Sequence, residues 1–338
     1  MIVVKANGYG HGSLNIAKHL SDEPGITFCV FTIQEGIELR REGINNPILI
    51  FSRIHKDWIA LAIKYKLWVN ACHQDDLIIL DQFHKENGNC PEIHLKFDTG
   101  MTRLGFDPKE TKKVIKYLSE HTYLPVNGIY SHFATADEGD LSYADSQLKK
   151  FNRILDICKD SGKQFGYIHC SNSGAVLNLP DSLFNTVRIG MLAYGIAPSD
   201  EVTMNIDVEP VMSFCGPIVN IRRVEAGTQI SYGGVYKTTR STNIGVIQTG
   251  FADGFPRPWY ENGYISYKGD PYNIAGRVCM DQFMVDFGDA VPELGDEVLI
   301  FGKKDEDHIP VETIAKSIGT TTYVLLTAIQ GRTDLVTI

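Results

Sequence analysis

Over the first part of the chain, to about residue 195, short apolar runs alternate with longer runs in which apolar residues recur every three or four positions. Residues 109–121, for example, place Val114, Ile115 and Leu118 on one face of a helix. Residues 141–159 repeat the pattern. The short apolar runs predict eight strands, at residues 2–4, 27–31, 47–51, 67–69, 93–97, 126–130, 167–169 and 187–189.

Alternation of strands with helices is typical of a parallel sheet. Eight such units can close into a (β/α)8 barrel of the TIM type, which typically takes about 250 residues and can be shorter. A doubly wound open sheet is the alternative arrangement. We favour the barrel because polar and reactive residues follow many of the predicted strands, and the carboxyl ends of barrel strands form one rim where active sites lie.

Around residues 207–210 the pattern changes to short strands interrupted by glycine. Such strands predict a mostly antiparallel β domain, so we expect a barrel at residues 1–208 and a β domain at residues 209–338. Residues 311–317 are expected to form a brief helix, and residues 321–330 a helical or extended piece. The predicted strands are residues 217–224, 230–236, 243–249, 264–267, 272–278, 284–287 and 297–301.

Composition narrows the possible functions. With 338 residues, of which 43% are hydrophobic, the chain can bury a sizeable core. A net charge of −9 argues against nucleic acid or an anionic membrane as the main partner, and no apolar run is long enough to span a bilayer. The sequence shows no signal peptide. Its seven cysteines form no Cys-x-x-Cys pair, which is typical of a reducing cytoplasm without structural zinc or disulfides.

The first predicted strand runs directly into Lys5, which three glycines alternating with Asn7, Tyr9 and His11 then follow. A lysine at the mouth of a buried strand can be partly desolvated, which lowers the pKa of its amine and frees it for Schiff-base chemistry. A surface lysine followed by a flexible turn is the other interpretation. Which interpretation of Lys5 is correct depends on the residues that follow the other predicted strands.

Ionisable and hydroxyl side chains follow other predicted strands of the first part. Each alone has an ordinary structural explanation, such as an internal ion pair or a histidine bonded to the backbone. Their convergence on one barrel rim predicts a site. They are Lys96, Asp98 and Arg103 after the fifth strand, Ser131 and His132 after the sixth, His169, Ser171 and Ser173 after the seventh, and Arg188, Gly190 and Met191 around the eighth.

Two segments of the second part carry candidate chemistry. Ser231-Tyr232-Gly233-Gly234 places a tyrosine beside two glycines that expose it, and residues 276–281 form a junction of polar and apolar positions that contains Met280 and Asp281. Taken singly, Tyr232 can be an ordinary strand tyrosine, and Met280 can simply fill the core.

In their order and number, these motifs resemble those of the alanine racemases, a family of enzymes that use pyridoxal 5′-phosphate. Residues 3–12 are similar to the family's cofactor-lysine motif, and Lys-Phe-Asp-Thr-Gly-Met-Thr-Arg-Leu-Gly at residues 96–105 is similar to a second motif. The family fold, an α/β barrel followed by a β domain, agrees with the pattern above. Further matches lie at residues 131–137, 169–173, 187–190, 231–233, 250–254 and 276–281.

The resemblance implies that the chain interconverts L-alanine and D-alanine and so supplies D-alanine for bacterial peptidoglycan. Lys5 would bind the cofactor covalently and act as acid and base on one face of the substrate α-carbon. Tyr232, from the other subunit of a homodimer, would act on the opposite face. Two such groups suit racemisation, because one removes the α-proton and the other returns a proton from the far side.

The resemblance also implies supporting roles. Arg188 would face the pyridine nitrogen of the cofactor; a guanidinium keeps its protons, so that nitrogen would stay unprotonated and the cofactor would be a restrained electron sink. His132 and His169 would orient Arg188 and couple it to Tyr232. Phosphate contacts would come from Tyr9, Ser173, Gly190, Met191 and Tyr323. Substrate carboxylate contacts would come from Arg103, braced by Lys96, which is carbamylated in many family members, and from the partner's Met280, with Asp281 supporting.

Two features depart from the family pattern. Family members usually have a strand and a helix ahead of the lysine motif, whereas this chain starts almost at the first barrel strand. Phe251 stands where the family commonly has tyrosine, at the substrate entryway. Two alternatives therefore remain: a racemase for serine or a wider range of amino acids, and a protein that binds pyridoxal phosphate without turnover. Tyr323, close to the substrate methyl in the family, favours alanine.

Overall fold

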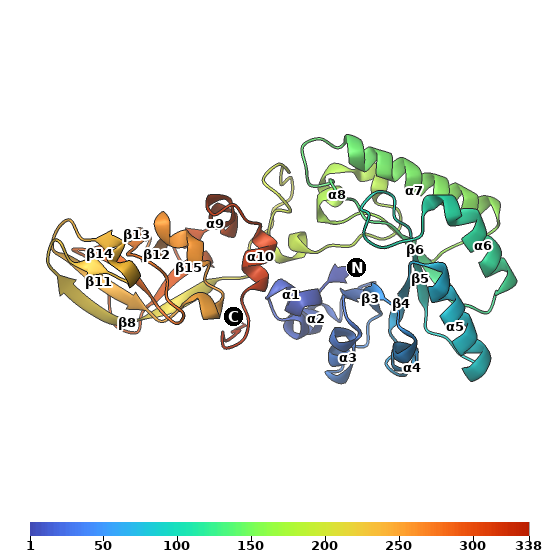
Figure 1. Cartoon of the computed structure of the whole chain (residues 1–338), viewed down its shortest axis with the longest axis horizontal. Helices are drawn as coiled ribbons and strands as arrows, with labels where there is room; N and C mark the ends of the chain where they lie inside the picture. Colours follow the sequence, from blue (N-terminus) through green and yellow to red (C-terminus); the bar gives the residue numbers. More distant parts are fainter. Residues whose placement is uncertain (338) are drawn as a thin grey trace. The chain divides into compact units, whose positions relative to one another are not determined.

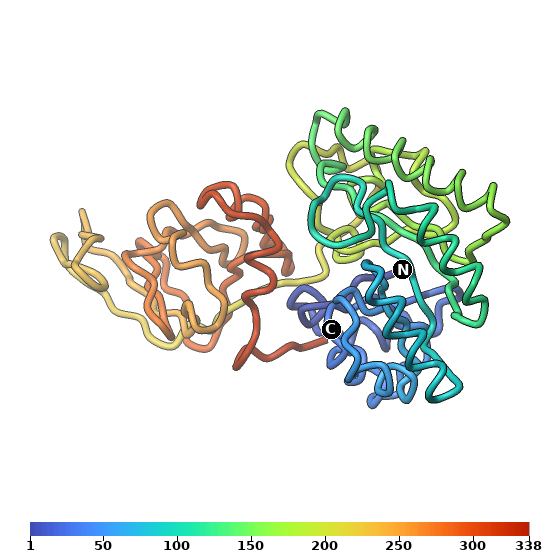
Figure 2. Tube along the Cα trace, turned by 45° about the vertical axis from the view of Figure 1, so that its right-hand side comes forward, coloured from blue at the N-terminus to red at the C-terminus, as the bar shows by residue number. Residues whose placement is uncertain are grey.

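The computed structural model describes residues 1–337, which divide into two compact units. The first unit comprises Met1–Gly8 and Gly12–Val208, and the second comprises Tyr9–His11 and the chain from Glu209 onward. Figures 1 and 2 show both units, with the first coloured from blue to yellow-green.

Seven short strands of the first unit form one parallel sheet, in chain order from β1 to β7. Their apolar side chains are largely buried on both faces, as expected for strands covered by helices. All seven overlap the predicted ranges. They are β1 (Ile2–Val3), β2 (Phe28–Val30), β3 (Ile48–Arg53), β4 (Trp68–Ala71), β5 (Ile93–Lys96), β6 (Val126–Tyr130) and β7 (Tyr167–His169).

Residues 187–189, predicted as the eighth strand, are described by the structure but do not form a strand, so that prediction was wrong. Two isolated parallel bridges, between Thr186 and His169 and between Ile189 and Ile2, instead join this segment to β7 and β1. The two-residue strand β1 pairs with Ile189 through hydrogen bonds from Ile189 N–H to the Met1 carbonyl (2.9 Å) and from Val3 N–H to the Ile189 carbonyl (2.9 Å). Because β1 is so short, it offers only one bridge position. The curled sheet still closes, which confirms the barrel.

Helices cover the outside of this curled sheet (Figure 1), because each buries one apolar face. The two longest predicted helices are confirmed as α6 (Thr111–Glu120) and α7 (Ser142–Asp160). The other segments are α1 (Lys5–Tyr9), α2 (Ser13–Leu20), α3 (Ile33–Arg41), α4 (Ile59–Lys64), α5 (Gln74–Asn87) and α8 (Ser173–Asn178), with 3-10 turns η1 (Lys56–Trp58), η2 (Pro108–Glu110), η3 (Pro180–Ser182) and η4 (Met191–Tyr194).

The second unit is built on a mostly antiparallel sheet of order β12-β13-β14-β11-β8-β15-β16, which confirms the β domain. Buried residues alternate along β14, as expected for a strand with one face on the core. Its elements are β8 (Phe214–Val224), β11 (Thr242–Ile247), β12 (Tyr264–Tyr267), β13 (Asp270–Ile274), β14 (Phe283–Gly288), β15 (Glu297–Lys304), β16 (Asp307–Ile309), α9 (Val311–Ser317) and α10 (Thr322–Thr327), with 3-10 turns η6 (Phe251–Asp253) and η7 (Arg257–Glu261).

The predicted strand at residues 230–236 is in fact a two-stranded hairpin. Strands β9 (Gln229–Ile230) and β10 (Tyr236–Lys237) pair antiparallel, and the 3-10 turn η5 (Tyr232–Gly234) lies between them. The chain cannot stay extended there, because φ is positive at Ser231 (64°), Gly233 (74°) and Gly234 (55°). The sequence analysis also missed β16 (Asp307–Ile309). Among residues 1–337, none of the helices is both long and apolar enough for a bilayer span.

Candidate active site

Lys5 begins a left-handed turn at the carboxyl end of β1. Ala6 (φ 51°, ψ 50°), Asn7 (54°, 44°) and Gly8 (63°, 41°) all have left-handed helical dihedrals, and Tyr9 follows with φ 52°. Such a conformation costs a non-glycine residue roughly 1–2 kcal/mol. The surrounding contacts must therefore hold this turn in place.

Glu35 supplies one of those contacts. Its Oε1 accepts a hydrogen bond from Ala6 N–H (2.7 Å), while its Oε2 accepts from Phe31 N–H (2.9 Å) and Thr32 N–H (2.8 Å). One carboxylate thus caps helix α3 and fastens the backbone next to Lys5. The contact between Glu35 and Ala6 was not predicted. The sequence contains the Thr32-x-x-Glu35 capping box, but a capping box does not reveal a contact with a residue 29 positions away.

Four cationic side chains influence one another on this rim. Burial, and then the charge of Arg103, lower the pKa of the Lys5 amine. Burial, and then Arg103 and Arg188, lower the pKa of Lys96 to about 8. Among the described residues, no carboxylate forms an ion pair with any of these four side chains. The rim is therefore a positively charged surface suited to an anionic ligand.

Arg188 is almost completely buried (3% exposed) and is held by neutral acceptors. Nη1 donates to His169 Nδ1 (2.8 Å) and to the His169 carbonyl (3.1 Å). Nη2 donates to the carbonyls of Ser131 (2.8 Å) and Cys170 (3.0 Å) and to His132 Nδ1 (3.2 Å). The predicted grouping of Arg188 with both histidines is thus present in the structure.

Both histidines are neutral in this setting. Burial lowers the pKa of His169 well below its ordinary value, and the charge of Arg188 lowers it further. The same two causes act, in the same order, on His132. The Tyr130 ring stacks on His169, with centroids 4.6 Å apart and planes inclined by 10°, and also faces the cationic ends of Arg188 (5.3 Å) and Lys96 (5.6 Å). Tyr130 was not among the predicted site residues.

Arg103 is exposed, and its loop is organised by Asp98. Asp98 Oδ1 accepts from the N–H groups of Gly100 (2.9 Å) and Thr102 (3.0 Å), and Oδ2 accepts from that of Arg103 (3.0 Å). Asp98 was singled out because it follows a predicted strand, but only the loop geometry shows that it holds the backbone around Arg103. The arrangement leaves the Arg103 guanidinium outside any ion pair among the described residues.

A small polar cradle lies at the start of α8. Ser173 Oγ accepts hydrogen bonds from the N–H groups of Gly190 (3.0 Å) and Leu192 (3.4 Å). Because both contacts use Ser173 as an acceptor, its hydroxyl proton remains available for donation. Gly190 and Met191, both predicted, are buried beside it at the start of η4.

Tyr232 and Met280 belong to the second unit, and both are exposed, by 68% and 56%. The loop that carries Tyr232 is fastened to the segment before Met280, because Ser231 Oγ donates to the Arg277 carbonyl (2.6 Å). Gly276 permits this approach, since a Cβ there would lie 2.8 Å from that of Ser231. Among the described residues, none accepts a hydrogen bond from the Met280 N–H.

The Met280 segment is held by the loop at residues 250–253 and by the chain near the C-terminus. Ala252 N–H donates to the Met280 carbonyl (3.0 Å), and Gly250 N–H donates to Asp253 Oδ2 (2.8 Å). Arg332 then bridges Asp253 (2.6 Å) and Asp281 (2.6 Å). Arg332 was not predicted; its partners lie 79 and 51 positions away, so only the fold reveals the contact. Also in the second unit, the rings of Tyr9 and Tyr323 lie 5.9 Å apart.

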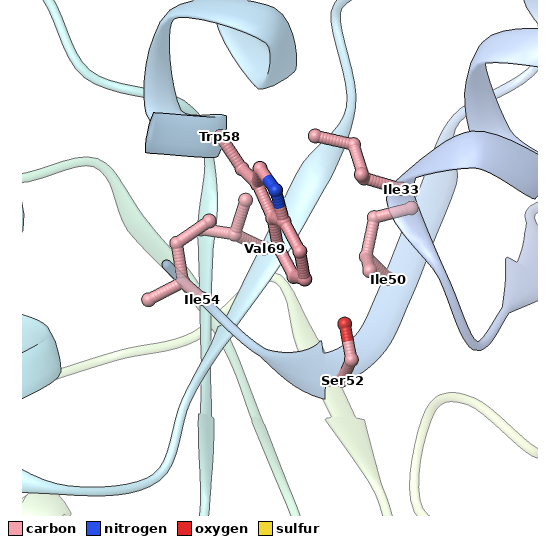
Figure 3. Close-up of a pocket in the computed structure, with 6 residues that line it drawn as sticks. All are labelled: Ile33, Ile50, Ser52, Ile54, Trp58 and Val69. Carbon is pink, nitrogen blue, oxygen red and sulfur yellow. The ribbon is translucent and has the colours of Figure 1, made fainter. Parts of the chain in front are cut away.

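A small cavity elsewhere in the first unit is apolar and separate from these groups. Figure 3 shows its lining, and about 10 Å³ remains for the centre of a water-sized molecule, which is room for roughly one water. Residues 1–337 also contain no cluster of three or more histidine, cysteine or acidic side chains that could hold a metal ion. The cavity is lined by Ile33, Ile50, Ser52, Ile54, Trp58 and Val69.

The first unit therefore brings together Lys5, Lys96, Arg103, His132, His169 and Arg188, with the Ser173 cradle on the same rim. A partly desolvated lysine and a buried arginine at the mouth of a parallel barrel, in a chain that also carries an antiparallel β unit, define a class of lysine-based enzymes that take anionic ligands. The comparison with known proteins narrows that class. A family model described as the N-terminal domain of alanine racemase matches residues 1–198, and one described as the C-terminal domain matches residues 211–337. The chain belongs to the alanine racemase family.

Individual relatives agree along nearly the whole chain. The alanine racemase of Desulforamulus reducens is 38% identical over 335 residues, which cover 98% of this chain and 90% of that protein. The solved alanine racemase of Clostridium difficile 630 has a TM-score of 0.91 and 36% identity over 97% of this chain and 86% of its own. That of Bartonella henselae, with covalently bound pyridoxal phosphate, has a TM-score of 0.87 and 26% identity, with 98% of this chain and 90% of that chain covered.

Proposed function

We propose that this chain is a pyridoxal 5′-phosphate-dependent racemase that interconverts L-alanine and D-alanine. The observation that carries the proposal is the cationic rim of the barrel, where Lys5, with its lowered pKa, lies within electrostatic range of Arg103. Membership of the alanine racemase family supports the choice of substrate. We further propose that the product serves peptidoglycan synthesis in the cytoplasm, a location that the seven free cysteines support.

The residues present fit pyridoxal phosphate. An aldehyde needs an amine that loses its proton readily, and burial of Lys5 supplies one. A phosphate needs hydroxyl and backbone donors; the Ser173 hydroxyl offers the former, and the N–H groups of Gly190, which would donate to the phosphate in place of Ser173 Oγ, and of Met191 offer the latter. We include Tyr9 and Tyr323 in the phosphate site. When bound, the cofactor supplies an electron sink that makes the α-proton of an amino acid acidic.

The chain's own residues then divide the work. Lys5 Nζ takes or returns the α-proton on one face of the substrate. Arg188, which can only donate hydrogen bonds, would face the pyridine nitrogen without transferring a proton to it. His132 and His169 hold that guanidinium in place. Arg103 binds the substrate carboxylate, with Lys96 bracing it once the Lys96 amine is carbamylated.

We propose that the second proton-transfer group comes from another copy of the chain. The hydroxyl of Tyr232 acts on the opposite face of the α-carbon, and the Met280 N–H contacts the substrate carboxylate, with Asp281 supporting that segment. The exposure of Tyr232 and Met280 supports this interpretation, because both side chains are accessible to a second copy of the chain. The active form is therefore a homodimer in which Tyr232 and Met280 complete the partner's site.

Formation of D-alanine tests the proposal. The purified chain is incubated with pyridoxal phosphate and L-alanine, and the enantiomers are followed by chiral chromatography together with the cofactor absorbance. Approach to an equal mixture supports the proposal. A clear preference for serine would overturn the choice of alanine, and bound cofactor without turnover of any amino acid would identify a binding protein instead.

A further inference from the structure

A third histidine extends the arginine–imidazole contact away from the rim. His94 lies on β5 and is completely buried, and its Nδ1 is 3.0 Å from His169 Nε2. Because His169 Nδ1 contacts Arg188, the three side chains form a continuous line: Arg188, His169, His94. His94 was not among the predicted site residues, although it precedes Lys96 by two positions and so projects from the same face of β5.

The hydrogen bonds among Arg188, His169 and His94 allow only one assignment of the protons on the two imidazole rings. Arg188 has donors and no acceptor, so His169 Nδ1 must accept and carries no proton. A neutral imidazole keeps one proton, so His169 carries it on Nε2 and donates it to His94 Nδ1. His94 must then carry its own proton on Nε2. The opposite assignment would leave His169 without any proton on its ring.

Gly128 and Trp68 pack closely against the His94 ring. The residue paired with it on β6 is Gly128, and a Cβ there would lie 2.2 Å from His94 Nδ1. The ring also stacks on Trp68, with centroids 5.1 Å apart and planes inclined by 24°. Burial, followed by the charge of Arg188, lowers the pKa of His94 to about 3, so the ring stays neutral at physiological pH.

The far nitrogen of His94 has no partner. Nε2 is buried and makes no hydrogen bond among the described residues, including Trp68 and Gly128 beside it. An unsatisfied buried donor costs free energy, and an apolar side chain of similar shape would avoid that cost. The part of His94 that does make a contact is Nδ1, an acceptor placed at the one proton that His169 has to donate.

We propose that His94 is a positioning residue: it accepts the Nε2 proton of His169 and so stabilises the Nε2–H tautomer in which His169 Nδ1 accepts from Arg188. The proposal rests on the proposed function for its effect on turnover, but the tautomer itself does not depend on that function. Without an acceptor at His94, the proton of His169 has no buried partner at Nε2. If that proton moved to Nδ1, it would face the donor Nη1 of Arg188, and the 2.8 Å contact would be lost.

Two substitutions separate the acceptor from the ring. His94→Asn places an amide oxygen close to the position of Nδ1 and keeps the acceptor. His94→Phe keeps a stacked ring and removes the acceptor. If His94 only fills space, His94→Phe should perturb the protein less than His94→Asn does. If His94 acts as the acceptor for His169, His94→Asn should perturb it less.

The first readout is the ring ¹⁵N spectrum of histidine-labelled protein without cofactor, assigned with a His169→Gln variant. We expect wild type and His94→Asn to have an unprotonated Nδ1 and a protonated, hydrogen-bonded Nε2 on His169, and we expect the His94→Phe spectrum to show that this Nε2–H group has lost its acceptor. A protonated Nδ1 in wild type would overturn the proposal, whether or not the Phe variant folds. An unchanged His169 spectrum in a folded His94→Phe protein would also overturn it.

The second readout is turnover of the cofactor-loaded enzyme. For His94→Phe we expect kcat to fall about tenfold, which corresponds to about 1.4 kcal/mol, with KM within twofold of wild type. For His94→Asn we expect kcat within about threefold. Equal kcat values for the two variants would contradict the proposal. If wild type forms no D-alanine, the proposed function fails while the spectrum still decides the role of His94.

Discussion

The rim of the first unit and the Tyr232–Met280 face of the second unit carry their candidate residues in opposite ways. On the rim, Arg188, His169 and Lys96 are buried, and Arg188 alone contacts two imidazoles and three carbonyls. On the other face, Tyr232 and Met280 are exposed. The rim is therefore preorganised within one chain, whereas the Tyr232–Met280 face has its backbone held in place and its side chains exposed.

Substitutions on the rim should act through charge and desolvation, and, under the proposed homodimer, substitutions on the exposed face should act through the assembled enzyme. The expected effects can be ranked by how directly each residue touches the reaction. Four tests, two for each region, follow in that order.

Lys5→Ala removes the amine that binds cofactor and transfers a proton. We expect racemisation to fall by about 10⁴-fold or more, because both covalent binding and acid–base catalysis are lost. The absorbance band of covalently bound cofactor should also disappear. Lys18→Ala, a lysine on α2 that is exposed, is the matched control and should keep both signals. A Lys5→Ala protein that keeps the band would contradict the assignment.

Tyr232→Phe removes only the hydroxyl of the exposed tyrosine. We expect cofactor binding to persist and turnover from L-alanine to fall by about 10²–10⁴-fold, the usual range for a lost acid–base group. Tyr236→Phe, in the same hairpin, is the control, because its hydroxyl donates to Asp286 (2.6 Å) and serves the fold. Turnover unchanged in Tyr232→Phe would exclude the two-group mechanism.

The lowered pKa of Lys96 should make the free energy of unfolding depend on pH. Its pKa of about 8 in the folded chain lies below the ordinary 10.5, so between these values the unfolded chain binds more protons and stability rises with pH. Relative to Lys96→Met, the free energy of unfolding of wild type should increase by roughly 3 kcal/mol between pH 7 and pH 10.5.

Denaturant unfolding of both proteins at several pH values, in buffers free of carbon dioxide, measures this difference. Exclusion of carbon dioxide matters because a neutral lysine amine can react with it. A difference in free energy that stays constant across this pH range would show that burial does not perturb Lys96.

Arg332→Gln breaks the bridge between Asp253 and Asp281, and we expect the smallest effect. The arginine side chain is half exposed (53%), so the loss in stability should be small. Because the bridge supports the Met280 segment, KM for alanine should rise about twofold to threefold while kcat changes little. Arg240→Gln, which removes an exposed pair with Asp289, is the control. Equal KM values for the two variants would leave Arg332 without a role at the site.

Much of the fold was predictable because it depends on local periodicity. Short apolar runs located all seven barrel strands, apolar residues at helical spacing located α6 and α7, and the change of pattern near residue 208 indicated the antiparallel sheet. The errors came where backbone conformation overrode side-chain pattern. Positive φ angles at Ser231 and Gly233 turn a predicted strand into a hairpin, and a two-residue β1 leaves residues 187–189 with single bridges.

The sequence by itself determined which chemistry is available: an amine at Lys5, a permanent cation at Arg188, and a tyrosine, Tyr232, beside two glycines. These are properties of residue type and of neighbours in the chain. Strand ends also indicated that Lys5 and Arg188 would share one rim, because parallel strands place their carboxyl ends on the same side.

Only the tertiary structure decided how those groups are held and charged. Glu35 reaches the backbone beside Lys5, and His94 reaches His169 from a position 75 residues away. The lowered pKa values of Lys5 and Lys96 arise from burial and from the charges of Arg103 and Arg188, which other parts of the chain bring close. Desolvation, hydrogen-bond direction and the electrostatic field depend on distance in space, and the order of residues along a chain does not contain that distance.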